Sequence, residues 1–208
     1  MECSFSVNAI TKSATLVYNV CLKKCDADSI SNFANAKQFN KLCETGCLNY
    51  GKKWSCPPHS PNYRDFSVGW DNLFILYARI ELFQFSYAKN DYLKVKAANS
   101  VLKSRADKFL RYVVAKYGRY ISTGSCRLCK PCKCKMGQPC AHPDLMTYSF
   151  EAMGIDVDKL IIEQFQKPLL WYKPHCLPEY TSVVCGLLTN AEITAEDLKE
   201  EYLQYIMF

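Results

Sequence analysis

Apolar residues recur along the chain with two periods, and these periods predict its secondary structure. The stretch ATLVYNV, near residue 14, and the stretch TSVVCGLLT, residues 181–189, are rich in β-branched residues and predict strands. Residues 72–87 are almost continuously apolar, which is typical of a strand buried on both faces of a central sheet. Arg79 and Glu81 lie within that stretch, so each needs a partner there.

A helical period predicts one long helix and several shorter ones. The long helix covers Asp91 to Tyr117 and ends at Gly118, with a buried face that includes Leu93, Ala97, Val101, Phe109 and Val113. Shorter helices are expected from Ser29 to Leu42 (stopped by Gly46), at 143–154, at 156–165, and at 194–207, where Thr194 opens the last one.

Two cysteine loops, residues 43–63 and 124–143, interrupt these elements. Glycine, proline and asparagine in the first loop exclude regular structure over most of its length. The predicted fold class is α/β or α+β: one metal-binding domain over residues 1–208, built as a mixed sheet flanked by helices, with two irregular cysteine-rich loops. A segregated α+β arrangement is the alternative.

Thirteen cysteines in 208 residues need a chemical explanation. A chain of this length buries a core without crosslinks, and an odd number of thiols cannot pair completely. The N-terminus lacks a secretion signal, and no window approaches the roughly 18 apolar residues of a membrane span. We therefore expect a cytoplasmic protein without a membrane partner, whose thiols bind metal or act in redox chemistry.

The net charge of +6 and a pI near 8.6 fall short of a surface built for nucleic acid. Nine lysines and arginines lie between Lys89 and Arg119 against two acids, Asp91 and Asp107. This face suits an acidic electron-donor protein such as a ferredoxin, or a phosphate-bearing ligand, although a solvated helix face is the simpler interpretation. The sequence does not indicate an oligomeric state.

The second loop contains Cys126, Cys129 and Cys132 in a C-x2-C-x2-C run, followed by Cys140. Three closely spaced thiolates and a distant fourth favour a [4Fe–4S] cluster, whereas zinc ligands usually come as two separated pairs. Arg127, Lys130, Lys133 and Lys135 would stabilise the negative charge of such a site, or simply be solvated. Cys134 is an additional thiol that this assignment leaves unexplained.

The first loop contains Cys43, Cys47 and Cys56, spaced C-x3-C-x8-C, with turns expected at Gly51 and at Pro57 and Pro58. Three ligands can hold a cluster with one coordination position open for a substrate. Alternatively, a fourth ligand closes the site, or these cysteines are ordinary small apolar residues. The candidate fourth ligands are Cys3, Cys21, Cys25, Cys176, Cys185 and His59.

The remaining candidates give weaker signals. Cys21 and Cys25 have the spacing of one helical face and suit either ligation or surface thiols. His59, His142 and His175 each adjoin a proline, so turn positions are favoured over ligation or proton transfer. No dinucleotide loop, phosphate loop, HExxH helix or nucleophile elbow is present in the sequence.

The motifs GCLNYGKKWSCPP, GSCRLCKPC with CAHP, and SFEAMGIDV together resemble the cysteine-rich family of predicted metal-binding proteins known as domain of unknown function 2284. The resemblance runs from about Cys43 to Val157. It implies a metal or iron–sulfur role for seven shared cysteines and no particular reaction; these are Cys43, Cys47, Cys56, Cys126, Cys129, Cys132 and Cys140. Cys134 and the long spacer before Cys140 depart from the pattern of the family.

The leading hypothesis is an iron–sulfur protein with a four-cysteine [4Fe–4S] cluster in the second loop and a second, open-site cluster in the first. Its role would be low-potential electron transfer or cluster-based redox or sulfur chemistry. The alternative is a structural zinc module whose surface binds a protein or nucleic acid. The sequence identifies no catalytic residue and does not separate an enzyme from an electron carrier.

Overall fold

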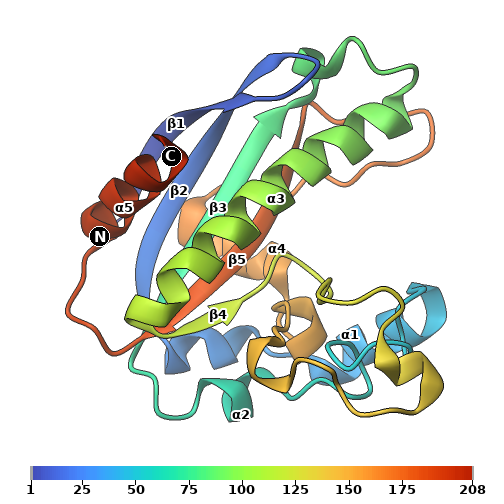
Figure 1. Cartoon of the computed structure of the whole chain (residues 1–208), viewed down its shortest axis with the longest axis vertical. Helices are drawn as coiled ribbons and strands as arrows, with labels where there is room; N and C mark the ends of the chain where they lie inside the picture. The colour runs from blue at the N-terminus through green and yellow to red at the C-terminus, as the bar shows by residue number, and fades with distance from the viewer. Residues whose placement is uncertain (1, 208) are drawn as a thin grey trace.

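A computed structural model describes residues 2–207. One antiparallel sheet in the order β1-β2-β3-β5-β4 runs through its centre (Figure 1). The strands are β1 (Glu2–Ile10), β2 (Thr15–Asp26), β3 (Asn72–Glu81), β4 (Arg119–Ile121) and β5 (Tyr180–Thr189). The α-helices are α1 (Ala36–Gly46), α2 (Tyr63–Ser67), α3 (Asp91–Tyr117), α4 (Val157–Phe165) and α5 (Ala195–Met207).

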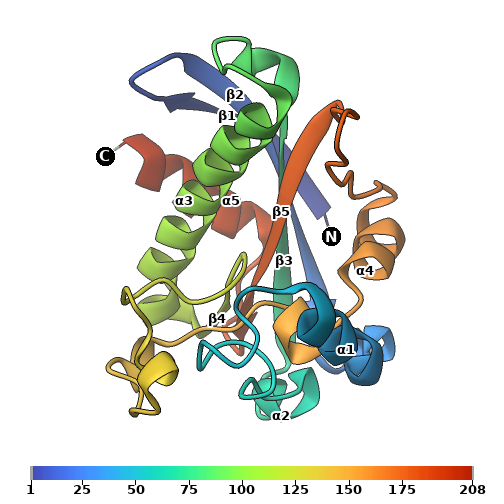
Figure 2. The ribbon, with the colours of Figure 1, turned by 90° about the vertical axis from the view of Figure 1, so that its right-hand side faces the viewer.

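Helices cover both faces of this sheet, as Figure 2 shows: α3 and α5 lie on one side, and α4 and α1 on the other. Two core clusters result. Phe74 and Leu76 point to the α3 side, whereas Leu73 and Ile75 point to the α4 side, so β3 is buried on both faces as predicted. The expected α/β or α+β class, with helices flanking a sheet and two irregular cysteine loops, is confirmed. All four strand pairings are antiparallel.

The long helix has the predicted bounds, and Gly118 follows it with a φ of 152°. Phe109 and Val113 are buried, but Leu93, Ala97 and Val101 are only partly buried. The centre of the buried stripe instead follows Ala98, Leu102, Ala106 and Leu110. The predicted helix at 156–165 and the strand at 181–189 are also confirmed, each within one residue.

The predicted helix from Ser29 to Leu42 is wrong in its first half. Short 3-10 turns occupy Asp28–Phe33, and α1 begins only at Ala36. Ala34 is extended and bridges to Ile155, and the Asn35 side chain then caps α1 by accepting from the Gln38 N–H. Residues 143–154 likewise form 3-10 turns at Pro143–Leu145 and Glu151–Met153 rather than one helix. The backbone between them is held beside the end of β4, because the Ser122 N–H, one residue after that strand, donates to the Tyr148 carbonyl.

The expected strand at 72–87 stops at Glu81, where the ladder with β5 ends, and 3-10 turns follow at Leu82–Phe85. A further 3-10 turn, Lys133–Met136, lies in the second loop. Arg79 finds two partners: its guanidinium lies 3.7 Å from the Glu81 carboxylate and 5.0 Å from the centroid of the Tyr180 ring.

The terminal helix opens as expected. The Thr194 hydroxyl accepts from the Asp197 N–H at 3.2 Å, and the Asp197 carboxylate accepts from the Thr194 N–H at 2.8 Å, forming a reciprocal cap. Among residues 2–207, no helix is both long and apolar enough to cross a membrane. The proposed domain extent of 1–208 remains a prediction, and its first and last residues lie outside the described part of the chain.

Candidate metal-binding loops

The two cysteine loops lie beside one end of the sheet (Figure 1). Side chains of the first loop hydrogen-bond to the backbone of the second. The Ser55 hydroxyl accepts a 2.9 Å hydrogen bond from the Cys126 N–H. The Lys53 ammonium donates to the Ser125 hydroxyl at 2.9 Å and to the Cys126 carbonyl at 3.1 Å. Both peptide groups that flank the Cα of Cys126 are therefore held by the first loop.

Two further contacts hold the far side of the second loop. The Trp54 indole N–H donates to the Gln138 carbonyl at 2.9 Å. Cys134 is buried, with 8% of its residue surface exposed. Its thiol donates a hydrogen bond to the Gly51 carbonyl oxygen, 3.7 Å from the sulfur. Cys134, unexplained by the sequence, thus anchors one loop against the other.

The first loop folds back on itself around its three cysteines. Cys43 is in the last turn of α1, and the Cys47 N–H donates to the Cys43 carbonyl at 3.0 Å, so the two thiols are one helical turn apart. Gly51 has a φ of 63°, and its N–H donates to the Pro57 carbonyl at 2.9 Å. The turn that the sequence predicted at Gly51 therefore returns the chain toward α1 at Cys56.

The pKa values of these thiols reflect their surroundings. Burial raises the pKa of Cys56 to about 11, the Ser55 hydroxyl opposes this rise, and negative charge on Cys47 and Cys43 adds to it. Burial also raises the pKa of Cys43, and the negative charges of Cys47 and Glu151 raise it further. Besides burial, the charge of Cys47 thus contributes to the raised pKa of both Cys43 and Cys56.

The second loop is also irregular over most of its length. The Lys135 N–H donates to the Cys132 carbonyl at 3.1 Å, within the single 3-10 turn of the loop. Burial raises the pKa of the Tyr148 phenol, Arg119 lowers it, and charges on Cys140 and Cys126 raise it further. Cys126 and Cys140, distant in sequence, therefore lie near the same hydroxyl.

The donor chemistry of both loops fits a soft metal, because all seven predicted ligands are thiols and the thirteen cysteines are free. Within residues 2–207, however, no three Cys, His, Asp or Glu side chains are grouped closely enough to hold a metal ion. The loops thus bring the predicted ligands into one region without assembling a coordination sphere. Convergence of the thiols would have to accompany metal binding.

The other cysteines occupy structural positions far from the first loop in sequence. Cys3 donates to the Ala195 carbonyl at 3.2 Å, and Cys185 is fully buried and donates to the Leu76 carbonyl at 3.8 Å. Cys176 is exposed in a turn.

Cys21 and Cys25 lie on β2 and not on a helix, which corrects the helical spacing considered for them. The Cys21 sulfur accepts from the Ser4 hydroxyl at 3.2 Å and from the Lys167 ammonium at 3.3 Å. Cys25 donates to the Gln164 side-chain oxygen at 3.4 Å. β2 places both thiols on the sheet face that α4 covers.

The three histidines are exposed. The His59 ring packs edge-on against Trp54 with centroids 4.7 Å apart, within the first loop. His142 precedes a 3-10 turn, and His175 has a φ of 63° in the turn closed by Lys173 and Cys176. Turn positions, as favoured from sequence, describe all three.

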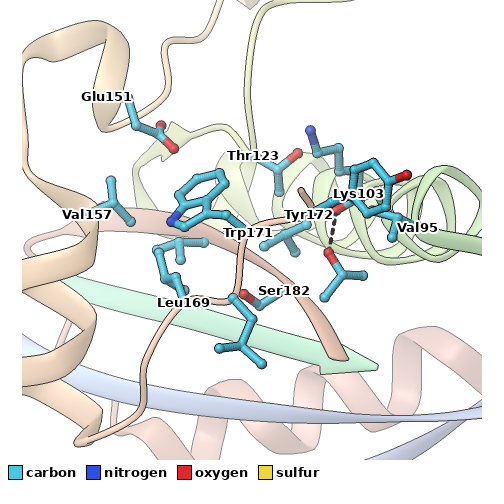
Figure 3. Close-up of a pocket in the computed structure, with 14 residues that line it drawn as sticks. Val95, Lys103, Thr123, Glu151, Val157, Leu169, Trp171, Tyr172 and Ser182 are labelled. Atoms are coloured by element: carbon cyan, nitrogen blue, oxygen red, sulfur yellow. Dashed lines mark hydrogen bonds between the residues drawn. The ribbon is translucent and has the colours of Figure 1, made fainter. Parts of the chain in front are cut away.

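A cavity of about 270 Å³ is lined mainly by residues of α3, β5 and the segment 169–172, and none of its lining residues belongs to either cysteine loop. Figure 3 shows Trp171 between Glu151 on one side and Thr123 with Lys103 on the other. Burial and the nearby Arg127 lower the pKa of Lys103, while Glu151 opposes that shift. Glu151, which lines this cavity, also contributes to the raised pKa of Cys43, after burial and the charge of Cys47.

Several of the cations between Lys89 and Arg119 already have partners. Lys94 pairs with Asp91, and Lys116 pairs with Glu201. Arg119 donates to the Phe66 carbonyl at 3.0 Å. Lys96 and Lys108 are exposed.

Sequence reasoning missed Lys53, Ser55, Trp54, Tyr148 and Glu151, the residues that join or surround the cysteines. The first three stand inside the motif GKKWSC, but nothing in their spacing indicates that they bind the other loop. Contacts across more than seventy residues become visible only in the fold.

Comparison with known proteins supports the metal-binding interpretation. No curated protein and no solved structure matched the chain. The family model described as "Predicted metal-binding protein (DUF2284)" matches residues 28–188. That range contains both cysteine loops and ends within β5. The chain therefore belongs to this family of predicted metal-binding proteins.

Proposed function

We propose that this protein is an iron–sulfur protein in which Cys126, Cys129, Cys132 and Cys140 hold one [4Fe–4S] cluster. The observation that carries the proposal is the all-thiol C-x2-C-x2-C run in an irregular loop whose first cysteine is fixed by the other loop. Besides burial, the charges of Cys140 and Cys126 both contribute to the raised pKa of Tyr148, which supports Cys140 as the fourth ligand in this proposal. A cluster would supply a site for reversible one-electron transfer.

A second centre, held by Cys43, Cys47 and Cys56, belongs to the same proposal. Cys3, Cys21, Cys25 and Cys185 have hydrogen-bond partners elsewhere, Cys176 is exposed in a turn, and the His59 ring packs against Trp54. We therefore assign no fourth protein ligand, which leaves one coordination position open. The cavity beside Glu151 would give a substrate access to this position. The proposed chemistry is low-potential electron transfer or cluster-based redox or sulfur chemistry.

The residues of the chain contribute charge and shielding. The Lys53 ammonium against the Cys126 carbonyl stabilises negative charge gathered in the second loop. Ser55 and Trp54 hold the two loops together and limit access of water to their interface. An acidic electron donor would meet the exposed Lys96 and Lys108 of α3, and this docking is part of the proposal.

Electron paramagnetic resonance of the reduced protein tests the two-centre proposal. Cyanide or a small thiolate should perturb one signal and leave the other unchanged, because only the first-loop centre has an exchangeable position. The responsive signal should be absent from Cys47→Ser and present in Cys176→Ser, which removes an exposed thiol outside both loops. A cyanide response that persists in Cys47→Ser would contradict the open first-loop site.

A further inference from the structure

A second cavity, of about 180 Å³, lies against the wall formed by α3, β4 and the second cysteine loop. Cys126 lines it, together with residues that have no assigned role in metal binding. A volume of this size admits a molecule of a few heavy atoms, since sites for drug-sized ligands start at about 300 Å³. The volume of the cavity therefore limits its ligand to a small molecule.

Among the charged residues of the lining, cations outnumber carboxylates by three to one. Lys108 and Arg111 approach from α3, and Arg127 approaches from the loop. None of the three forms an ion pair with a carboxylate of residues 2–207. Arg111 is held at the wall, with its guanidinium 5.4 Å from the centroid of the Tyr120 ring and a 3.4 Å hydrogen bond to the Leu145 carbonyl.

The single carboxylate of the lining, Asp107, is engaged elsewhere. Its Oδ1 accepts from the Tyr120 hydroxyl, from the Thr123 N–H at 3.2 Å and from the Thr123 hydroxyl at 2.9 Å. These donors stabilise the negative charge of Asp107 and occupy the oxygen nearest to them. Three cations against this one satisfied acid leave the cavity electropositive.

Thr147 adds an unused hydrogen-bonding group. Its residue is 7% exposed, it lines the cavity, and its hydroxyl has no hydrogen-bond partner among residues 2–207. Leaving a buried hydroxyl without a partner is costly, so such groups usually mark a ligand or a water. Thr147 therefore lines a cavity whose three cations have no carboxylate partner among the described residues.

We propose that this cavity binds a small inorganic oxyanion, of the sulfate or phosphate class, beside Cys126. Arg111 and Arg127 supply the planar donors that oxyanions favour, Lys108 adds charge, and the Thr147 hydroxyl donates to a further oxygen. The inference goes beyond the proposed function, because the binding groups are not metal ligands. It also places the anion next to a thiol that the proposed cluster would use.

Isothermal titration of the anaerobically purified protein, with its native metal content, tests the site. Sulfate and phosphate should each bind saturably at one site, whereas chloride at matched ionic strength should not. Arg111→Gln and Arg127→Gln should each weaken binding by roughly ten-fold or more. Lys37→Gln, which changes an exposed cation of α1 outside the cavity, should bind as the unaltered protein does.

Thr147→Val gives the sharpest result, because it keeps the side-chain shape. Without anion it should melt at the same temperature or higher, since the unpartnered hydroxyl is gone. With anion it should show less added thermal stability than the unaltered protein. The same anion-induced stabilisation in both proteins would overturn the role of Thr147 and indicate a bound water at the hydroxyl.

Three other outcomes would overturn the proposal. These are equal effects of sulfate and chloride, undiminished binding in Arg127→Gln, and binding of an acidic peptide without binding of either inorganic anion. Arg127 is exposed in the loop, so its variant remains informative if Arg111→Gln fails to fold. Metal content measured on the same samples separates failure of this site from failure of the proposed function.

Discussion

The Ser55 hydroxyl accepts a 2.9 Å hydrogen bond from the Cys126 N–H and so connects two cysteine loops that are far apart in sequence. Ser55 is itself buried, with 1% of its surface exposed. Its hydroxyl also lies 3.9 Å from the Cys56 sulfur. One side chain therefore contacts a predicted ligand residue of each loop.

Ser55→Ala should lower the free energy of unfolding by about 1–3 kcal/mol, because the Cys126 N–H loses its partner. Urea unfolding monitored by circular dichroism measures this change. Ser100→Ala is the matched control: its hydroxyl bonds within an exposed part of α3, and its effect should stay within about 0.5 kcal/mol. Equal effects of the two changes would show that the contact between the loops contributes nothing.

Cys129→Ser and Cys134→Ser should differ in bound metal. Cys129 is a proposed ligand, so its replacement should remove a whole centre's worth of iron. Cys134 instead faces the Gly51 carbonyl, so its replacement by serine should keep the iron at a small cost in stability. Metal analysis of both variants decides this, and loss of iron from Cys134→Ser would identify that thiol as a ligand.

Gly154→Ala should be strongly destabilising. Gly154 has a φ of 84°, and a Cβ there would lie 2.8 Å from both Cα and Cβ of Ala36 at the start of α1. Left-handed strain and overpacking together predict a loss of about 2–4 kcal/mol. Gly137→Ala, at a φ of 63° with open space around it, should cost only the strain, about 1–2 kcal/mol. If chemical denaturation gave similar losses of unfolding free energy for Gly154→Ala and Gly137→Ala, this would argue against close packing of α1 on Gly154.

The raised pKa of Cys56 predicts a pH dependence of the metal-free protein. The folded chain keeps this proton above pH 9.0, where an ordinary thiol ionises, and loses it only near pH 11. The resulting stabilisation is complete below pH 9.0 and disappears as the pH rises toward 11. Cys56→Ala should therefore lose less stability over this range than the unaltered chain, as measured by urea unfolding at each pH. Parallel curves would contradict the shifted pKa.

The spacing of apolar residues along the sequence predicted the long elements, in which that spacing is regular over many positions. The helix of α3 and strands β3 and β5 contain long apolar stretches, so their type was clear. Strand β2 was predicted only in its first half, and the continuation through residues 21–26 was missed. β1 was missed although residues 2–9 alternate polar and apolar side chains, which is the pattern of a strand exposed on one face. β4 was missed because three residues carry no period. Helix 29–42 was misplaced because the break at Ala34 depends on pairing with Ile155.

The cysteine positions and the turn at Gly51 were also accessible from the sequence, since spacing and backbone preference are local properties. The contact between the loops was not. Ser55, Lys53 and Trp54 act on residues more than seventy positions away, and a single serine or lysine has no local pattern that reveals a distant partner. The same applies to Cys134, whose role depends on where Gly51 lies in the fold.

Quantification of iron, acid-labile sulfide and zinc in protein purified under strict exclusion of oxygen tests the central claim most directly. The account predicts a brown protein with broad absorption near about 400 nm and with iron and sulfide in roughly equal amounts. Replacing Cys126, Cys129, Cys132 or Cys140 should lower both together. A colourless protein with stoichiometric zinc and no acid-labile sulfide would contradict the account and identify a structural zinc module instead.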